Sequence, residues 1–179
     1  MNNINLMQKL FNSSEKEIIL NCPQTKLSDL TQHLKAYLKE GDWIFLEGDL
    51  GTGKTTFAKE LINQFDSHLS STSPTFSILN SQKLTVPQGK VEKILHIDLY
   101  RMKSGKELLY LGLDQEFHRQ TTLAIFEWPS VVEEEEWSQF FEITRCEKPN
   151  RILQIEISME EEERQYKISF VYEITSGLE

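Results

Sequence analysis

The eight residues from Gly48 to Thr55, GDLGTGKT, constrain this chain more than any other part of its sequence. They match the phosphate-loop pattern G-x-x-x-x-G-K-[ST] without a gap. An apolar run, residues 43–47, comes before the motif, and an amphipathic stretch, residues 54–65, comes after it. The arrangement predicts a buried strand, a turn that wraps around phosphate, and a helix whose positive N-terminal end faces the anion.

Each fixed residue type in this phosphate loop has a physical role. Glycines let backbone N–H groups turn inward around phosphates without a Cβ clash. Lys54 is expected to reach the β- and γ-phosphates, and the Thr55 hydroxyl to complete the shell of a Mg²⁺ ion. The alternative is a glycine-rich turn that matches by chance. The residues expected to contact a nucleotide are Gly48, Asp49, Leu50, Gly51, Thr52, Gly53, Lys54, Thr55 and Thr56.

Asp98 is the first expected companion of the loop. It ends the apolar run ILHID, where a carboxylate of the Walker-B type helps to hold Mg²⁺. The alternative is an aspartate at a strand end that is satisfied by nearby backbone. His96 points the same way along the strand as Asp98. A lone strand histidine is more often structural than a ligand, so His96 is left outside the predicted site.

Thr75 is the second expected companion, in the stretch TSPTF, residues 72–76. Pro74 favours an extended conformation at the residue before it and stiffens the loop. Thr75 could then present its hydroxyl to the γ-phosphate or to Mg²⁺, as the switch threonines of GTPases do. An ordinary turn rich in serine and proline would have the same sequence.

Glu127 and Trp128 are the last two expected companions of the phosphate loop. They lie in FEWP, residues 126–129. In open α/β sheets the carboxyl ends of the strands border the ligand crevice. Glu127 could therefore orient or activate the attacking water, or reach Mg²⁺ through water. Trp128 could cover the nucleotide, or it could serve packing alone.

The order of apolar runs predicts an α/β fold: a P-loop NTPase-like mixed β-sheet flanked by helices, with antiparallel C-terminal strands. One domain is expected over residues 1–179, with residues 1–14 loosely ordered or holding a short helix at 6–11. The predicted strands are 17–21, 43–47, 75–84, 93–100, 123–128, 140–145, 151–158 and 166–174, with a turn at 85–90. The predicted helices are 28–39, 54–65 and 106–117, the last broken at Gly112.

The composition argues against two classes of protein. The net charge is −9, from 19 Lys and Arg against 28 Asp and Glu, which does not favour binding nucleic acid over a large surface. No apolar run is long enough to span a membrane. The two cysteines, Cys22 and Cys146, lie far apart without metal-like spacing, so a reduced, cytoplasmic setting is expected.

One absence bears on which nucleotide is bound. No N-K-x-D sequence is present, so the base-reading element of GTPases is missing and ATP is the expected nucleotide. Arg101 is the candidate for an arginine that stabilises transferring phosphate. Two further readings stay open: a small kinase, which would need an acceptor pocket with its own base, and an adaptor that binds ATP and hardly cleaves it.

These residues resemble the bacterial TsaE family of tRNA threonylcarbamoyladenosine biosynthesis ATPases. The resemblance runs from about residue 15 to residue 168, and its anchors are GDLGTGKTTF, SPTF, HIDLYR, LGLDQEF and EWP, in that order. It implies a cytoplasmic ATPase, weak alone, that resets the TsaD–TsaB transferase between cycles of threonylcarbamoyl transfer to tRNA. The partners would hold the tRNA, and this chain would contact it indirectly.

The resemblance also assigns roles to the companions. Lys54 and Thr55 carry over as phosphate and Mg²⁺ contacts. Thr75 carries over as a switch residue, Asp98 as a residue of the metal site, Glu127 as a catalytic residue that also lies at the metal, and Trp128 as a residue near the nucleotide.

Overall fold

The computed structural model describes residues 3–12, 15–69, 77–160 and 163–173. The strands are β1 Glu17–Cys22, β2 Asp42–Glu47, β3 Leu79–Gln88, β4 Val91–Asp98, β5 Thr122–Glu127, β6 Arg151–Glu160 and β7 Glu163–Glu173. The α-helices are α1 Asn3–Phe11, α2 Leu27–Lys35, α3 Lys54–Phe65, α4 Leu113–Glu116 and α5 Glu134–Thr144. Short 3₁₀ helices are η1 Gln24–Lys26, η2 Gly105–Tyr110 and η3 Pro129–Val131.

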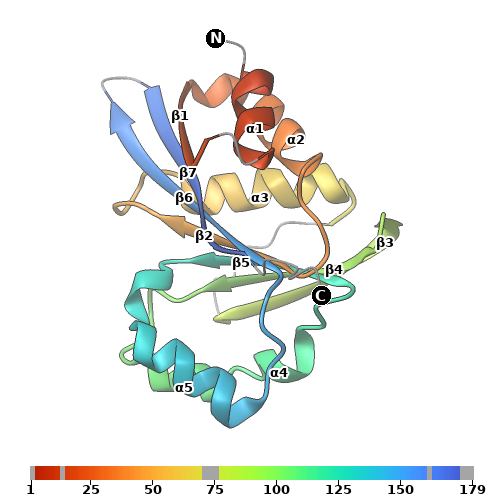
Figure 1. The fold of residues 1–179 in the computed structure, drawn as a ribbon, viewed down its shortest axis with the longest axis vertical. Helices are drawn as coiled ribbons and strands as arrows, with labels where there is room; N and C mark the ends of the chain where they lie inside the picture. The colour runs from red at the N-terminus through yellow and green to blue at the C-terminus, as the bar shows by residue number, and fades with distance from the viewer. Residues whose placement is uncertain (1–2, 13–14, 70–76, 161–162, 174–179) are drawn as a thin grey trace.

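The strands form one sheet in the order β1-β7-β6-β2-β5-β4-β3 (Figure 1). The strand before the phosphate loop, β2, lies between β5 and β6 and is parallel to both, and β4 is parallel to β5. The outer pairs β1–β7, β6–β7 and β3–β4 are antiparallel. The predicted α/β fold with a mixed sheet is confirmed. The carboxyl ends of β2, β5 and β4 consequently lie at one edge of the sheet.

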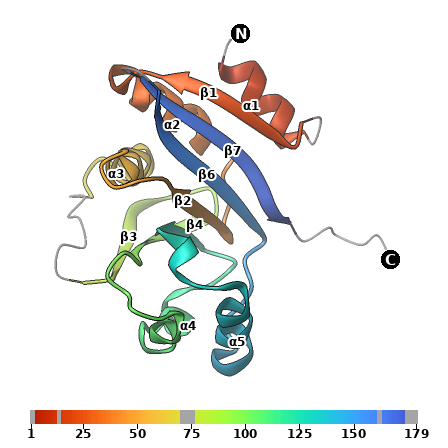
Figure 2. The same cartoon turned by 90° about the vertical axis from the view of Figure 1, so that its left-hand side faces the viewer.

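Helices α1, α2 and α3 cover one face of the sheet, and α4 and α5 cover the other (Figure 1). Alternating residues of β5 serve both layers: Leu123 and Ile125 belong to the core beneath α3, and Ala124 and Phe126 to the core on the opposite face. Strands β1, β7 and β6 extend beyond α4 and α5 (Figure 2). On β1, buried and exposed residues alternate, as expected of a strand with one solvated face.

Residues 140–145 are not a strand, which corrects one prediction. They belong to α5, except for Arg145, which caps that helix in the left-handed conformation. The start of α5 is fixed by a capping box between Glu133 and Glu136. Phe141 of α5 stacks against Trp43 of β2, and Trp137 packs against the same ring at a tilt. The acidic residues 133–136 therefore mark the start of a helix.

The β3–β4 hairpin corrects a second prediction. β3 begins at Leu79, and it continues to Gln88 through most of the stretch expected to be a turn. Residues 75 and 76 of the predicted strand lie outside the described residues. β3 is an edge strand, where Pro87 is tolerated, and its pairing with β4 is irregular between Lys83 and Gln88.

The remaining helices and strands differ from the predicted ones mainly in where they begin and end. α2 ends at Lys35, four residues before the predicted end of that helix. The segment 106–117 is divided at Gly112, as predicted, but its first half is 3₁₀ helix rather than α-helix. α1 contributes the buried residues Met7 and Leu10 to the core. Among the described helices, none has the length and apolar character needed to cross a bilayer.

Candidate functional site

The side chain of Lys54 lies at the centre of the phosphate loop. Its Nζ donates hydrogen bonds to the backbone carbonyls of Gly48 at 2.5 Å and Asp49 at 2.8 Å. Burial lowers the pKa of Lys54, while the carboxylates of Glu127, Glu47, Asp49 and Asp98 act in the opposite direction. A buried ammonium surrounded by carboxylates can bind a phosphate only if further positive charge accompanies it.

Two glycines of the loop lie close to the C-terminal hairpin. A Cβ on Gly48 would collide with the backbone carbonyl of Ile157 on β6, and the φ of Gly48 is +135°. A Cβ on Gly53 would lie 2.9 Å from Nε of Arg164 on β7, and the φ of Gly53 is +106°. Gly48 therefore needs glycine for both conformation and space, whereas at Gly53 the positive φ is the main requirement, because the Arg164 side chain could shift.

Arg164 ties the hairpin to the loop. Its Nε donates to the carbonyl of Thr52 at 2.7 Å, and its Nη1 donates to Oε1 of Gln24 at 3.1 Å. The Thr52 hydroxyl in turn donates to the carbonyl of Asp49 at 3.0 Å. The loop is thus held from outside by a side chain 112 residues further along the sequence.

Glu127 connects the start of α3 with the end of β5. The Thr55 hydroxyl donates to Oε2 of Glu127 at 2.7 Å, and Nε2 of His96 lies 2.7 Å from Oε1. Glu127 and His96 are 1% and 2% exposed. Both point to the α3 side of the sheet, because they alternate with residues that belong to the opposite core. Each carboxylate oxygen of Glu127 therefore has a defined partner.

Asp98 lies beside Glu127, since the two are partners in the parallel register of β4 and β5. Its Oδ1 accepts a hydrogen bond from the backbone N–H of Tyr100 at 3.1 Å. Burial raises the pKa of Asp98, and the nearby charge of Glu127 raises it further; the Tyr100 N–H, His96 and Arg101 oppose the shift. Two adjacent carboxylates at strand ends form a site that attracts a cation.

Trp128 covers the ammonium of Lys54. Nζ lies 3.6 Å from the centroid of the ring, a cation–π geometry, and the ring also contacts Tyr100 at a centroid distance of 5.1 Å. Trp128 has φ +60° and ψ +43° and precedes Pro129. A left-handed conformation in a bulky residue costs on the order of 1–3 kcal/mol, and such conformations concentrate at functional sites.

These side chains line one small cavity of about 260 Å³. Its lining residues are Leu50, Gly51, Gly53, Lys54, Thr55, Thr56, Asp98, Tyr100, Glu127 and Trp128. We call it the strand-end cavity. It brings together the carboxylates, lysine, threonine and tryptophan that the sequence predicted for a nucleotide site.

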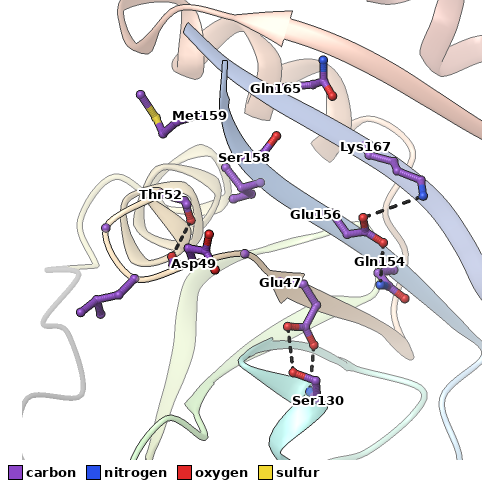
Figure 3. Close-up of a pocket in the computed structure, with 14 residues that line it drawn as sticks. Glu47, Asp49, Thr52, Ser130, Gln154, Glu156, Ser158, Met159, Gln165 and Lys167 are labelled. Carbon is purple, nitrogen blue, oxygen red and sulfur yellow. Dashed lines mark hydrogen bonds and ion pairs between the residues drawn. The ribbon is translucent and has the colours of Figure 1, made fainter. Parts of the chain in front are cut away.

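A larger groove of about 720 Å³ lies on the other side of the same loop (Figure 3). We call it the hairpin groove, because β6 and β7 form much of it; its other lining residues include Gly48, Asp49 and Thr52. Its polar groups are mostly paired with one another: Glu47 accepts hydrogen bonds from Ser130, and Glu156 lies 3.8 Å from Lys167. Leu50 and Gly51 line both cavities.

Four further residues bear on the predicted site. Thr75 lies outside the described residues, so its role stays a prediction. His96 was considered and left aside, and the structure places it against Glu127. Arg164 had no signal in the sequence, because nothing local relates it to the loop. Arg101 is exposed just beyond β4 and acts electrostatically on Asp98.

The oxygen donors of the strand-end cavity fit a Mg²⁺ ion. Mg²⁺ prefers oxygen ligands, and in nucleotide sites it combines one or two protein groups with phosphate oxygens. The Thr55 hydroxyl and the carboxylates of Asp98 and Glu127 all line the cavity. The carboxylates around Lys54 give a second reason for a divalent cation, since they would otherwise repel a polyphosphate.

Comparison with known families yields one model that covers most of this chain. The family model described as Threonylcarbamoyl adenosine biosynthesis protein TsaE matches residues 23–166. The match includes the phosphate loop, β4, β5 and α5, and it ends within β7.

Individual relatives carry the same description, tRNA threonylcarbamoyladenosine biosynthesis protein TsaE. That of Rickettsia bellii (strain RML369-C) is 36% identical over 117 residues, which cover 65% of this chain and 76% of the relative. That of Bacillus subtilis (strain 168) is 39% identical over 100 residues, which cover 56% of this chain and 58% of the relative. The matched part thus spans three quarters of one relative and little more than half of the other.

A solved structure is similar over nearly the whole chain. The crystal structure of Bacillus subtilis YdiB superposes with a TM-score of 0.57 and 28% sequence identity. The aligned region covers 88% of this chain and 87% of that chain. The mixed sheet described above is therefore an arrangement that a related protein also adopts.

Proposed function

Because the chain belongs to the TsaE family of threonylcarbamoyl adenosine biosynthesis proteins, we propose that it binds and hydrolyses ATP in the cytoplasmic machinery that makes threonylcarbamoyladenosine on tRNA. Its task there is to support repeated turnover of the TsaD–TsaB transferase. The free, buried thiols of Cys22 and Cys146 accord with a reducing compartment.

One observation carries this proposal: the 2.7 Å hydrogen bond between Thr55 and Glu127. It joins the first turn of the phosphate-loop helix to the carboxyl end of β5, beside Lys54 and Asp98. A phosphate loop alone supports binding. A buried strand-end carboxylate within reach of the helix start adds a group that can act on a water at the γ-phosphate.

Lys54 is the residue proposed to bind the phosphates. Its present partners, the carbonyls of Gly48 and Asp49, are neutral acceptors. An ionised phosphate oxygen forms a stronger, charge-assisted hydrogen bond with an ammonium group. Trp128 shields Lys54 from water on one side, which strengthens that interaction.

Glu127 is the residue proposed to orient and deprotonate the attacking water. A bound Mg²⁺ ion would neutralise charge on the phosphates, held by the Thr55 hydroxyl with Asp98 alongside. Oε1 of Glu127 is fixed by His96 and Oε2 faces Thr55, so the carboxylate can act without first reorienting. Thr75 is proposed to complete the site as a switch residue.

The partners are proposed from the family and from charge. With a net charge of −9, this chain is a poor surface for tRNA, so the transferase complex would hold the nucleic acid. Exposed Leu50 and Tyr100 stand at the rim of the strand-end cavity. Hydrolysis is expected to be slow for the isolated chain and faster with TsaD and TsaB, because binding often orders mobile catalytic segments.

The decisive experiment measures threonylcarbamoyladenosine formed on tRNA by TsaD and TsaB, supplied with the activated donor, with and without this chain. The time course should extend well beyond one product per complex. We expect product to stall near one turnover without the chain and to accumulate with it, and Lys54→Ala to abolish the gain. An unchanged time course would overturn the proposed role.

A labelled γ-phosphate separates the remaining alternatives. The proposal predicts release of the label as free phosphate. Transfer to an acceptor would instead identify a kinase. An adaptor that needs only ATP binding would keep supporting the transferase after Glu127→Gln, whereas a hydrolysing subunit would lose this function.

A further inference from the structure

His96 contacts the proposed catalytic carboxylate but does not reach the strand-end cavity. Its side chain is 2% exposed, and it is absent from the residues that line the cavity. Nε2 lies 2.7 Å from Oε1 of Glu127. His96 therefore makes no contact of its own with the cavity; its hydrogen bond to Glu127 is its direct link to the site, beside a weaker electrostatic effect on Asp98.

The contact defines the proton arrangement on the imidazole. A carboxylate has no proton to donate, so the hydrogen bond requires a proton on Nε2 of His96. Oε2 of Glu127 meanwhile accepts from Thr55. Two donors on opposite oxygens fix both the position and the rotation of the carboxyl group, which a single contact would leave free to turn.

The location of His96 and Glu127 argues that their contact does more than fill space in the core. On the same face of β4, His96 lies between buried Ile94 and the site residue Asp98. The core beyond this pair is apolar, so an aliphatic residue could fill the space of His96, but it would leave the buried Oε1 of Glu127 without a hydrogen-bond partner. The register partner of His96 on β5 is Ile125, and Glu127 lies two residues further along β5, where Nε2 of His96 can reach its carboxylate.

We propose that His96 is a positioning residue that holds the Glu127 carboxylate in its productive orientation. This inference rests on the proposed ATP hydrolysis by Glu127. Removal of His96 frees Oε1, and Glu127 then spends part of its time turned away from the cavity. The binding of nucleotide through Lys54 and the loop amides is left intact.

The test compares variants of the full chain with Mg-ATP and the TsaD–TsaB complex. His96→Gln carries an amide N–H that can reach Glu127, whereas His96→Asn carries the same amide one methylene shorter. We expect His96→Asn to lower kcat on the order of 10- to 100-fold, the usual loss for such supporting partners. KM and the nucleotide Kd should stay within about twofold, and His96→Gln should recover most of kcat.

A double-substitution cycle separates positioning from a general loss of structure. If His96 acts only through Glu127, His96→Asn should cause no further loss of kcat in a Glu127→Gln background. An equal loss in both backgrounds would overturn the inference, as would a wild-type kcat in His96→Asn. Thermal unfolding of each variant shows whether the fold is kept, and the Gln and Asn pair remains comparable if both are modestly destabilised.

Measurements on the wild-type chain separate a failure of the role of His96 from a failure of the proposed function. If it hydrolyses ATP and His96→Asn does so equally well, only the role of His96 fails. If the wild-type chain binds ATP and releases no phosphate even with TsaD and TsaB, the proposed function fails and the role of His96 falls with it.

Discussion

The strand-end cavity and the hairpin groove share Leu50 and Gly51 but are built from different kinds of side chain. The groove is the larger, at about 720 Å³ against about 260 Å³. Its charged groups, such as Glu156 and Lys167, are partly or fully exposed and pair loosely. In the smaller cavity, Lys54 and Glu127 are buried, and each is held by short hydrogen bonds.

From this difference we expect the cost of burying polar groups to mark the functional site better than cavity volume does. Exposed ion pairs contribute little to stability and are easily replaced by water. A buried carboxylate or ammonium must be compensated by specific partners, so its geometry is fixed. Paired substitutions in the two cavities can test whether function follows the buried cluster rather than the larger space.

The largest effect is expected for Glu127→Gln, which removes the proposed base and keeps the shape. ATP hydrolysis should fall by at least about 10²-fold, the usual contribution of a general base, with nucleotide affinity little changed. The matched substitution in the groove, Glu156→Gln, should leave hydrolysis within about twofold. Phosphate release in the presence of TsaD and TsaB measures both. Similar losses in the two variants would break the comparison.

Lys54→Ala should have the next largest effect, on affinity. A hydrogen bond to a charged group contributes about 1.5–3 kcal/mol, so the Kd for ATP should rise roughly 10- to 100-fold. Lys167→Ala, which removes a lysine from the groove, is the control and should leave the Kd unchanged. Calorimetric titration with a non-hydrolysable ATP analogue checks both values. Equal weakening by Lys167→Ala would place the nucleotide in the groove.

Neighbouring residues of β7 give a finer test, because they face opposite sides of the sheet. Arg164 holds the carbonyl of Thr52, whereas Gln165 lines the groove. Loss of the Arg164 contact, at about 1 kcal/mol, should weaken ATP binding about fivefold. Gln165→Ala should not weaken it. The same titration applies, and an unaffected Arg164→Ala would show that the loop keeps its shape without the hairpin.

The smallest effect concerns Cys146, whose thiol lines a third hollow with Trp137 and Phe141. Burial raises the pKa of Cys146 to about 12, from an ordinary value of 9.0. Between these values the unfolded chain has lost the proton and the native chain has kept it, so the free energy of unfolding falls as pH rises.

Cys146→Ala should therefore reduce the loss of stability between pH 8 and pH 10, measured by urea unfolding at both values, and leave ATP hydrolysis unchanged. Tyr166, whose pKa burial also raises to about 12, supplies part of the remaining loss. If Cys146→Ala lost hydrolysis, Cys146 would be a functional residue although it lies outside the buried cluster around Glu127. Its shifted pKa would then have been a better guide to function than that cluster.

The parts of this structure that were predictable are those governed by local sequence. The phosphate loop requires a strand before it and a helix after it, and α3 begins and ends where the amphipathic pattern predicted. Residues 140–145 were misassigned because a short alternation of apolar and polar residues also occurs at a helix end. There the stronger signal was the capping pair Glu133 and Glu136.

The parts that were not predictable depend on strand order. Alternation along β4 placed His96 and Asp98 on one face, but it could not show that β5 lies next to β4 and presents Glu127 to His96. Arg164 reaches Thr52 only because β6 and β7 return to the edge of β2. Contacts between residues this far apart leave no periodic trace in a single sequence.

The position of β2 also sets the order in which the protein can mature during synthesis. The ribosome completes the phosphate loop by residue 55, yet the strand that anchors it pairs only with residues 124–127 and 151–156. Pairing between such distant segments forms slowly and late. A nascent chain therefore carries the nucleotide motif for most of its synthesis without the sheet that gives the motif its shape. The sheet on both sides of β2 can form only after residues 151–156 have been synthesised.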